Sequence, residues 1–175
     1  MASRMNSQKP SLQTLAELNA FFAESAVATW AGSGKETKSD SGLRVLTYSQ
    51  LKPSGKWDYQ DTYSGFYQSW GREIVTLNGK IIWSQNYGGG TEEKYIGDKD
   101  FAEQTFGFLK KALSAGDKEK TFQPRGPEMF YEGPWTYYSR VKGDITKFEG
   151  EEMILYGTEI VFRHKFFGGL VINGE

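Results

Sequence analysis

The chain of 175 residues contains no cysteine and only one histidine, His164. Without cysteine it can form neither disulfide bonds nor thiolate nucleophiles, and it can have no cysteine-bound metal site. A zinc site would also lack histidine ligands, because zinc is usually held by several cysteine or histidine side chains. We therefore expect no metal site, and the sequence indicates no cofactor.

The chain also lacks an excess of charge of one sign and a long apolar run. Its 21 basic and 22 acidic residues leave a formal charge of -1, which gives no field to attract nucleic acid. No apolar segment approaches the about 20 residues that span a bilayer. Residues 1–10 are polar, unlike a secretory signal, and we expect them to be disordered. We predict a cytoplasmic protein that binds neither nucleic acid nor membrane, as a monomer or homodimer.

Aromatic residues, in contrast, are abundant. The sequence holds 5 Trp, 10 Tyr and 12 Phe, so rings would supply much of the surface that is buried on folding. A chain of this length fits one domain. We predict a single α+β domain over residues 11–175.

An internal repeat is visible in the sequence. Residues 55–59 (GKWDY) recur as residues 133–137 (GPWTY), and after a one-residue insertion Glu73 corresponds to Glu152. Self-similarity of this kind indicates a repeated structural unit. We predict a helix followed by four antiparallel strands, used twice, with pseudo-repeats at about 11–97 and 98–170.

Periodicity places the elements of each predicted repeat. Apolar residues at helical spacing begin after Ser11 in the first half, and after Asp100 in the second half, where they stop before Gly116. The strands alternate with period two, and Asn78-Gly79 is a strong hairpin signal. The predicted fold is a curved antiparallel sheet with two helices. Gly88–Gly90 follows a strand, and we expect a turn there that lets the chain leave the sheet.

Polar residues interrupt the aromatic faces of the predicted strands at matching positions. Buried carboxylates are costly unless they are paired or hydrogen-bonded, so these positions need an explanation. One explanation is a small-molecule pocket with aromatic walls and a polar floor. The candidate ligand-binding residues are Trp57, Tyr59, Asp61, Glu73, Trp83, Gln85, Tyr87, Trp135, Tyr137, Glu152, Phe162 and His164.

Three of these residues are also catalytic candidates. A desolvated Glu73 or Glu152 would have a raised pKa and could move a proton, and His164 could titrate near neutral pH. The alternative is structural: the carboxylates lie near strand ends, or bond to Tyr, Trp, Arg72 or Arg140, and fix the register of the sheet. No serine lies in a nucleophile-elbow pattern, so the sequence gives no support for Ser-His-Asp chemistry.

The motifs of residues 57–65, 71–73 and 78–88, with residues 143–150 and 167–170, are similar to a bacterial family, domain of unknown function 5680. The resemblance extends from about Leu15 to Leu170 and implies no established activity. Some relatives are attached to helix-turn-helix regulators, which implies effector sensing; this chain shows no such domain.

These observations favour a stand-alone domain that binds or senses a small molecule on the aromatic face. A small cofactor-independent enzyme that uses Glu, Asp or His as general acid or base is the first alternative. An interaction protein of the inhibitor or immunity type is the second.

Overall fold

The computed structural model describes residues 11–31, 36–115 and 121–173. The predicted disordered tail at residues 1–10 lies outside this part. In the described residues, two α-helices and nine strands form an α+β fold with one open antiparallel sheet, whose strand order is β1-β2-β3-β4-β5-β9-β8-β7-β6. The strands are β1 (Thr37–Lys38), β2 (Arg44–Lys52), β3 (Gly55–Gly65), β4 (Gln68–Leu77), β5 (Lys80–Thr91), β6 (Met129–Glu132), β7 (Trp135–Asp144), β8 (Lys147–Tyr156) and β9 (Glu159–Leu170).

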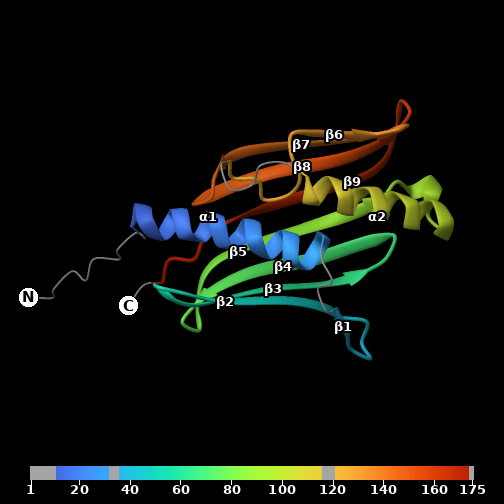
Figure 1. The fold of residues 1–175 in the computed structure, drawn as a ribbon. Helices are drawn as coiled ribbons and strands as arrows, with labels where there is room; N and C mark the ends of the chain where they lie inside the picture. The colour runs from blue at the N-terminus through green and yellow to red at the C-terminus, as the bar shows by residue number, and fades with distance from the viewer. Residues whose placement is uncertain (1–10, 32–35, 116–120, 174–175) are drawn as a thin grey trace, which may run out of the picture.

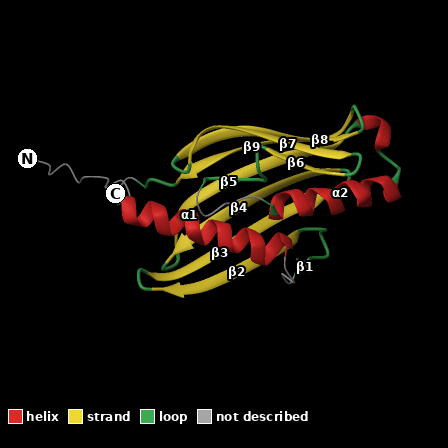
Figure 2. Cartoon of the chain, turned by 45° about the horizontal axis from the view of Figure 1, so that its top comes forward, coloured by secondary structure: helices red, strands yellow, loops and turns green. Residues whose placement is uncertain are grey.

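Helices α1 (Leu12–Ala26) and α2 (Lys99–Ser114) lie on the same face of the sheet (Figures 1 and 2). Ser11 caps α1 by accepting a hydrogen bond from the backbone N–H of Thr14, and Asp98 caps α2 in the same way. A π-helical turn (Val27–Ala31) extends α1 and contacts α2. No helix in the described part of the chain is both long and apolar enough to cross a membrane.

The two helices pack on two core clusters, and the cluster under α1 extends to Phe148 and Phe166 in the second half of the sheet. Phe21 and Phe22 of α1 pack against Trp57 and Trp83, and the tryptophans are fully buried. Phe108 and its neighbours on α2 pack over β7, β8 and β9 in a second core cluster. Because β5 pairs with β9, one continuous sheet joins both halves.

The alternation of the strands is confirmed except at two bulges. Register shifts at Val75/Thr76 and at Ile154/Leu155 change the faces beyond these points. As a result Ile81, which strict alternation would place on the inner face with Trp83, is 37% exposed, and Val161 is buried beside Phe162. The Asn78-Gly79 hairpin is confirmed: both residues have positive φ, as a two-residue turn between twisted strands requires.

The expected turn at Gly88–Gly90 is wrong, because these glycines lie inside β5 and pair with β4 and β9. The ring of Trp70 occupies the space beside Gly88, where a Cβ atom would meet Cε3 at 2.1 Å. Gly89 has a φ of 133°, and its missing side chain leaves room for His164 on the inner face. The glycines therefore permit close approach within the sheet.

Candidate functional site

Four ionisable side chains from four segments meet beneath the helices. Glu73 on β4, Glu152 on β8 and His164 on β9 surround Arg125, which lies in the irregular segment before β6. The exposed fraction is between 1% and 4% for each of the four. The predicted carboxylates thus point inward with the rings, and a basic residue that sequence reasoning did not select neutralises them.

Arg125 bridges the two halves of the sheet. Its Nη1 lies 3.3 Å from Oε1 of Glu73, and its Nη2 and Nε donate to Oε1 of Glu152 at 2.9 and 3.0 Å. The guanidinium also lies 4.6 Å from the ring centroid of Tyr87. Burial alone would lower the pKa of Arg125, but the two carboxylates raise it above its ordinary value. The guanidinium is therefore a permanent charge inside the fold.

The segment that carries Arg125 is held by its neighbours. Gln85 donates from Nε2 to the carbonyl oxygen of Pro124 at 3.1 Å, and the N–H of Gly126 donates to the Tyr137 hydroxyl at 2.9 Å. That hydroxyl donates to Oε2 of Glu152 at 2.6 Å. Two residues of the predicted binding set, Gln85 and Tyr137, thus position Arg125.

Glu152 and His164 form a buried hydrogen-bonded pair. Nδ1 of His164 lies 3.1 Å from Oε1 of Glu152. Burial would raise the pKa of Glu152, but Arg125 and His164 together lower it to about 2. Burial lowers the pKa of His164, and the bond to Glu152 offsets part of that effect. At neutral pH an ionised carboxylate therefore faces a neutral imidazole.

Asp61 forms a second buried acid beside this cluster. The Tyr87 hydroxyl lies 2.9 and 3.1 Å from the two carboxyl oxygens of Asp61. Across the β3–β4 ladder, Asp61 is directly opposite Glu73. Burial, and then the negative charge of Glu73, raises the pKa of Asp61 well above its ordinary value. The environment of Asp61 thus favours a protonated carboxyl.

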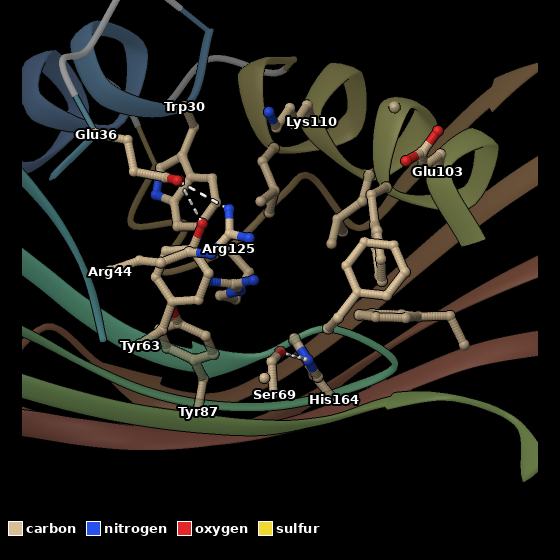
Figure 3. A pocket seen from close by; sticks show the side chains of 17 residues that line it. Trp30, Glu36, Arg44, Tyr63, Ser69, Tyr87, Glu103, Lys110, Arg125 and His164 are labelled. Carbon is tan, nitrogen blue, oxygen red and sulfur yellow. Dashed lines mark hydrogen bonds and ion pairs between the residues drawn. The ribbon is translucent and has the colours of Figure 1, made fainter. Parts of the chain in front are cut away.

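A pocket of about 330 Å³ lies between α2 and the sheet, beside this cluster. Its aromatic walls come from different elements: the π-helical turn, β3, β5, α2 and β9. Figure 3 shows Trp30, Tyr63 and Tyr87 around Arg125, with Ser69 and His164 together at another part of the wall. The ring residues that line it are Trp30, Tyr63, Phe66, Tyr87, Phe106 and Phe162.

The charged groups at the pocket wall are largely paired within the protein. Glu36 accepts hydrogen bonds from Nη1 of Arg44 at 2.8 Å and from the Tyr63 hydroxyl at 2.7 Å (Figure 3). Lys110 and Glu103 project from α2. At the polar end, Oγ of Ser69 lies 3.4 Å from Nε2 of His164.

All twelve residues predicted to bind a ligand lie in the described part of the chain, but they occupy three environments. Tyr87, Phe162 and His164 line the pocket. The carboxylates Asp61, Glu73 and Glu152 contact lining residues from behind. The others lie in the cores or position Arg125: Trp57, Tyr59 and Trp83 under α1, Trp135 against α2, and Gln85 and Tyr137 as described above.

Three residues of the candidate site were not predicted from the sequence: Arg125, Trp30 and Ser69. Arg125 lies between two prolines in a segment without periodicity, so no face could be assigned to it, whereas Arg72 and Arg140, named as partners, are exposed. Trp30 lies in the π-helical turn, beyond the α-helical period. Ser69 could have been found, because it precedes Glu73 by four residues on the same strand and therefore shares its face.

The chemistry available here is that of hydrogen bonds and proton transfer. Among the described residues no group of three or more acidic or histidine side chains could hold a metal ion. A neutral imidazole, an ionised carboxylate, a hydroxyl and a guanidinium lie within a few ångströms of an aromatic-walled pocket.

A family model, described as Domain of unknown function (DUF5680), matches residues 61–171. The chain belongs to this family. No curated protein and no solved structure matches it significantly. The matched residues begin at Asp61 and include Ser69, Arg125 and His164, whereas Trp30 lies before them. Because the family description carries no activity, function must be argued from the geometry.

Proposed function

We propose that this protein binds a small, mostly apolar compound in the pocket between α2 and the sheet, and acts as a ligand-binding or sensing domain. The observation that carries the proposal is the pocket itself: about 330 Å³, with aromatic walls and a polar end at Ser69 and His164. Ligand sites typically measure about 300–1,000 Å³ and combine apolar walls with a few polar groups. The buried ion cluster supports the site from behind.

Gly107 on α2 is a second observation in favour of a ligand. It lines the pocket in the interior of a helix, where glycine destabilises the fold by about 0.5–1 kcal/mol relative to alanine. A Cβ atom built on Gly107 would meet nothing within 4 Å, so packing does not require glycine there. A larger residue at this position would extend over the pocket.

The test is thermal unfolding against a panel of one- and two-ring aromatic compounds with hydroxyl, amide or ester groups. A compound that binds only the native state raises the unfolding midpoint by mass action. Gly107→Leu should remove this rise without unfolding the protein. Gln104→Leu, which adds the same side chain on an exposed part of α2, should keep it. A rise that Gly107→Leu leaves intact would place binding elsewhere, and no rise across the panel would refute the proposal.

We also infer that the two halves arose by duplication, and the registers support this. Asp61 pairs with Glu73 and Ser139 with Glu152; in the next ladder Glu73 pairs with Gln85 and Glu152 with His164. The bulges at Val75/Thr76 and Ile154/Leu155 fall at equivalent positions. Arg125 then joins the equivalent glutamates of the two repeats. The first half carries an additional short strand, β1, before the four expected ones.

We further propose that the protein is cytoplasmic and that it is a monomer or a homodimer. The near-neutral formal charge of -1 supports action on a small molecule, with no direct contact to nucleic acid. Size-exclusion chromatography with light scattering would determine the oligomeric state.

A further inference from the structure

Ser69, His164 and Glu152 form a hydrogen-bonded line at the polar end of the pocket. Oγ of Ser69 lies 3.4 Å from Nε2 of His164, and Nδ1 of the same ring lies 3.1 Å from Oε1 of Glu152. Ser69 and His164 both line the pocket, and Figure 3 shows their side chains pointing toward one another. Glu152 lies behind the imidazole and is fully buried.

The registers of the sheet explain why these residues meet. Ser69 on β4 pairs with Gly89 on β5, and Gly89 pairs with His164 on β9. Ser69 and His164 are therefore separated by one strand, and only a glycine lies between them. A Cβ atom on Gly89 would meet Cδ2 of His164 at 3.2 Å. On the other side of β9, Glu152 is directly opposite His164.

The hydrogen-bond partners determine the tautomer of His164. Glu152 is ionised and can only accept, so Nδ1 of His164 carries the proton. In this tautomer Nε2 carries a lone pair, and it lies 3.4 Å from the Ser69 hydroxyl that would donate to it. Burial lowers the pKa of His164, which keeps the imidazole neutral at pH 7 and so leaves it able to accept a proton. A hydroxyl, a neutral histidine and a buried carboxylate in this order are the arrangement by which serine is activated as a nucleophile.

We propose that Ser69, His164 and Glu152 are a nucleophilic triad that hydrolyses small, uncharged carboxylic esters bound in the pocket. This inference rests on the proposed ligand-binding function of the same pocket. Ser69 is the nucleophile and His164 the general base. Glu152 is a positioning residue that holds the histidine tautomer. Aromatic side chains such as Phe106 and Phe162 contact an apolar acyl or aryl group.

The reaction proceeds in two balanced steps. Ser69 Oγ attacks the ester carbonyl carbon while its proton passes to Nε2 of His164; the carbon–alkoxy bond then breaks, and the alcohol leaves with that proton. Water next attacks the acyl-serine and gives a proton to Nε2. The carboxylic acid leaves, and Ser69 Oγ takes the proton back. The net reaction adds one water to one ester.

An uncharged ester is the class that fits, because the two arginines that line the pocket already have acidic partners in the protein. Arg125 contacts Glu73 and Glu152, and Arg44 contacts Glu36. A carboxylate or ammonium group on the substrate would compete with these ion pairs.

The experiment is covalent labelling of the full chain with a fluorophosphonate, with p-nitrophenyl butyrate hydrolysis measured in parallel. We expect one label per chain on the peptide that contains Ser69, and an initial burst of p-nitrophenol. Ser69→Ala should abolish both. Ser84→Ala should keep both, because it removes a half-buried hydroxyl of β5 that only accepts a hydrogen bond from Nε of Arg72 on β4. Labelling at another residue, no labelling, or equal hydrolysis by Ser69→Ala would overturn the triad.

Two further variants assign the roles. His164→Gln should slow hydrolysis by about 100- to 10,000-fold, the usual contribution of a general base. Glu152→Gln should move the midpoint of the pH–rate profile to lower pH, since Glu152 raises the pKa of His164. An unchanged midpoint would reject this role of Glu152.

The binding proposal and the triad can fail separately. If aromatic compounds still raise the unfolding midpoint of Ser69→Ala but no serine is labelled in the wild type, the binding proposal stands and the triad fails. If no compound binds, the pocket proposal fails first.

Discussion

At the scale of single residues, Glu152 is hydrogen-bonded to three side chains of the candidate site. One of its oxygens accepts from Arg125 and His164, and the other accepts from Tyr137. Such a carboxylate is stable in the interior only because its donors replace the water it has lost. The same contacts set the protonation of His164, so the fold and the chemistry depend on one group.

Arg125→Met should destabilise the protein by about 3–5 kcal/mol, because it leaves the buried Glu73 and Glu152 without their cation. Urea unfolding followed by circular dichroism measures the change. Arg140→Met, on the exposed face of β7, should stay within about 0.5 kcal/mol of the wild type. Equal effects of the two substitutions would contradict the assigned role of Arg125.

Asp61→Asn should stabilise the protein, and more so at pH 8 than at pH 4. Burial raises the folded-state pKa of Asp61 above its unfolded value, so the native state binds more protons. The contribution of Asp61 to the free energy of unfolding is therefore fully present below its unfolded pKa of about 4, and it is lost as pH rises from there through the raised folded-state pKa. Asparagine keeps an acceptor for Tyr87 and removes this loss. Unfolding midpoints at both pH values test the sign, and a gain that does not grow with pH would argue against a protonated Asp61.

His164 and Glu152 give the opposite pH dependence, because their folded pKa values are lowered. Their contribution is fully present above the unfolded value of about 6.5 for histidine, and it falls with pH from there down to about 2. The contribution of this pair to the free energy of unfolding should therefore decline steadily below pH 6.5. In Glu152→Gln the part of this decline between about pH 4.5 and 2 should be smaller.

At the scale of elements, α2 forms both a core face and the roof of the pocket. Phe108, Leu109 and Ala112 are buried, whereas Gly107 is exposed at the pocket wall. Leu109 belongs to the core and also lines the pocket, so the two faces of the helix adjoin one another.

Gly107→Ala should raise the free energy of unfolding by about 0.5–1 kcal/mol, because alanine loses less backbone entropy in a helix. Denaturant titration gives the value. Ligand binding should be retained, since a methyl group fills little of the pocket. A destabilising effect would show that Gly107 is required by backbone strain or close packing.

Gly89→Ala on β5 should lower the free energy of unfolding, in contrast to Gly107→Ala. A Cβ atom there would meet the carbonyl oxygen of Arg163 at 2.3 Å as well as the His164 ring, and a φ of 133° disfavours any side chain. We expect lower stability together with loss of serine labelling. Gly79→Ala, at a turn with open space around it, should lower stability through its φ alone and keep the labelling.

At the scale of the whole molecule, the ladder between β5 and β9 and the bridge of Arg125 join the two halves. Nine residue pairs connect β5 to β9. Because each half completes the sheet and the ion cluster of the other, we expect one cooperative unfolding transition. Tryptophan fluorescence, to which the first half contributes four of the five tryptophans, and circular dichroism should give the same midpoint. Two separate midpoints would mean that the halves unfold independently.

The sequence by itself determined the helices, the strand alternation, the Asn78-Gly79 hairpin and the inward direction of Glu73, Glu152 and His164. These features follow from local periodicity, which each segment carries alone. The tertiary structure decided that Arg125 neutralises the two glutamates, that His164 reaches Ser69 across Gly89, and that bulges turn Ile81 outward. Such pairings depend on which strands become neighbours and on the path of an aperiodic segment, and no local pattern contains either.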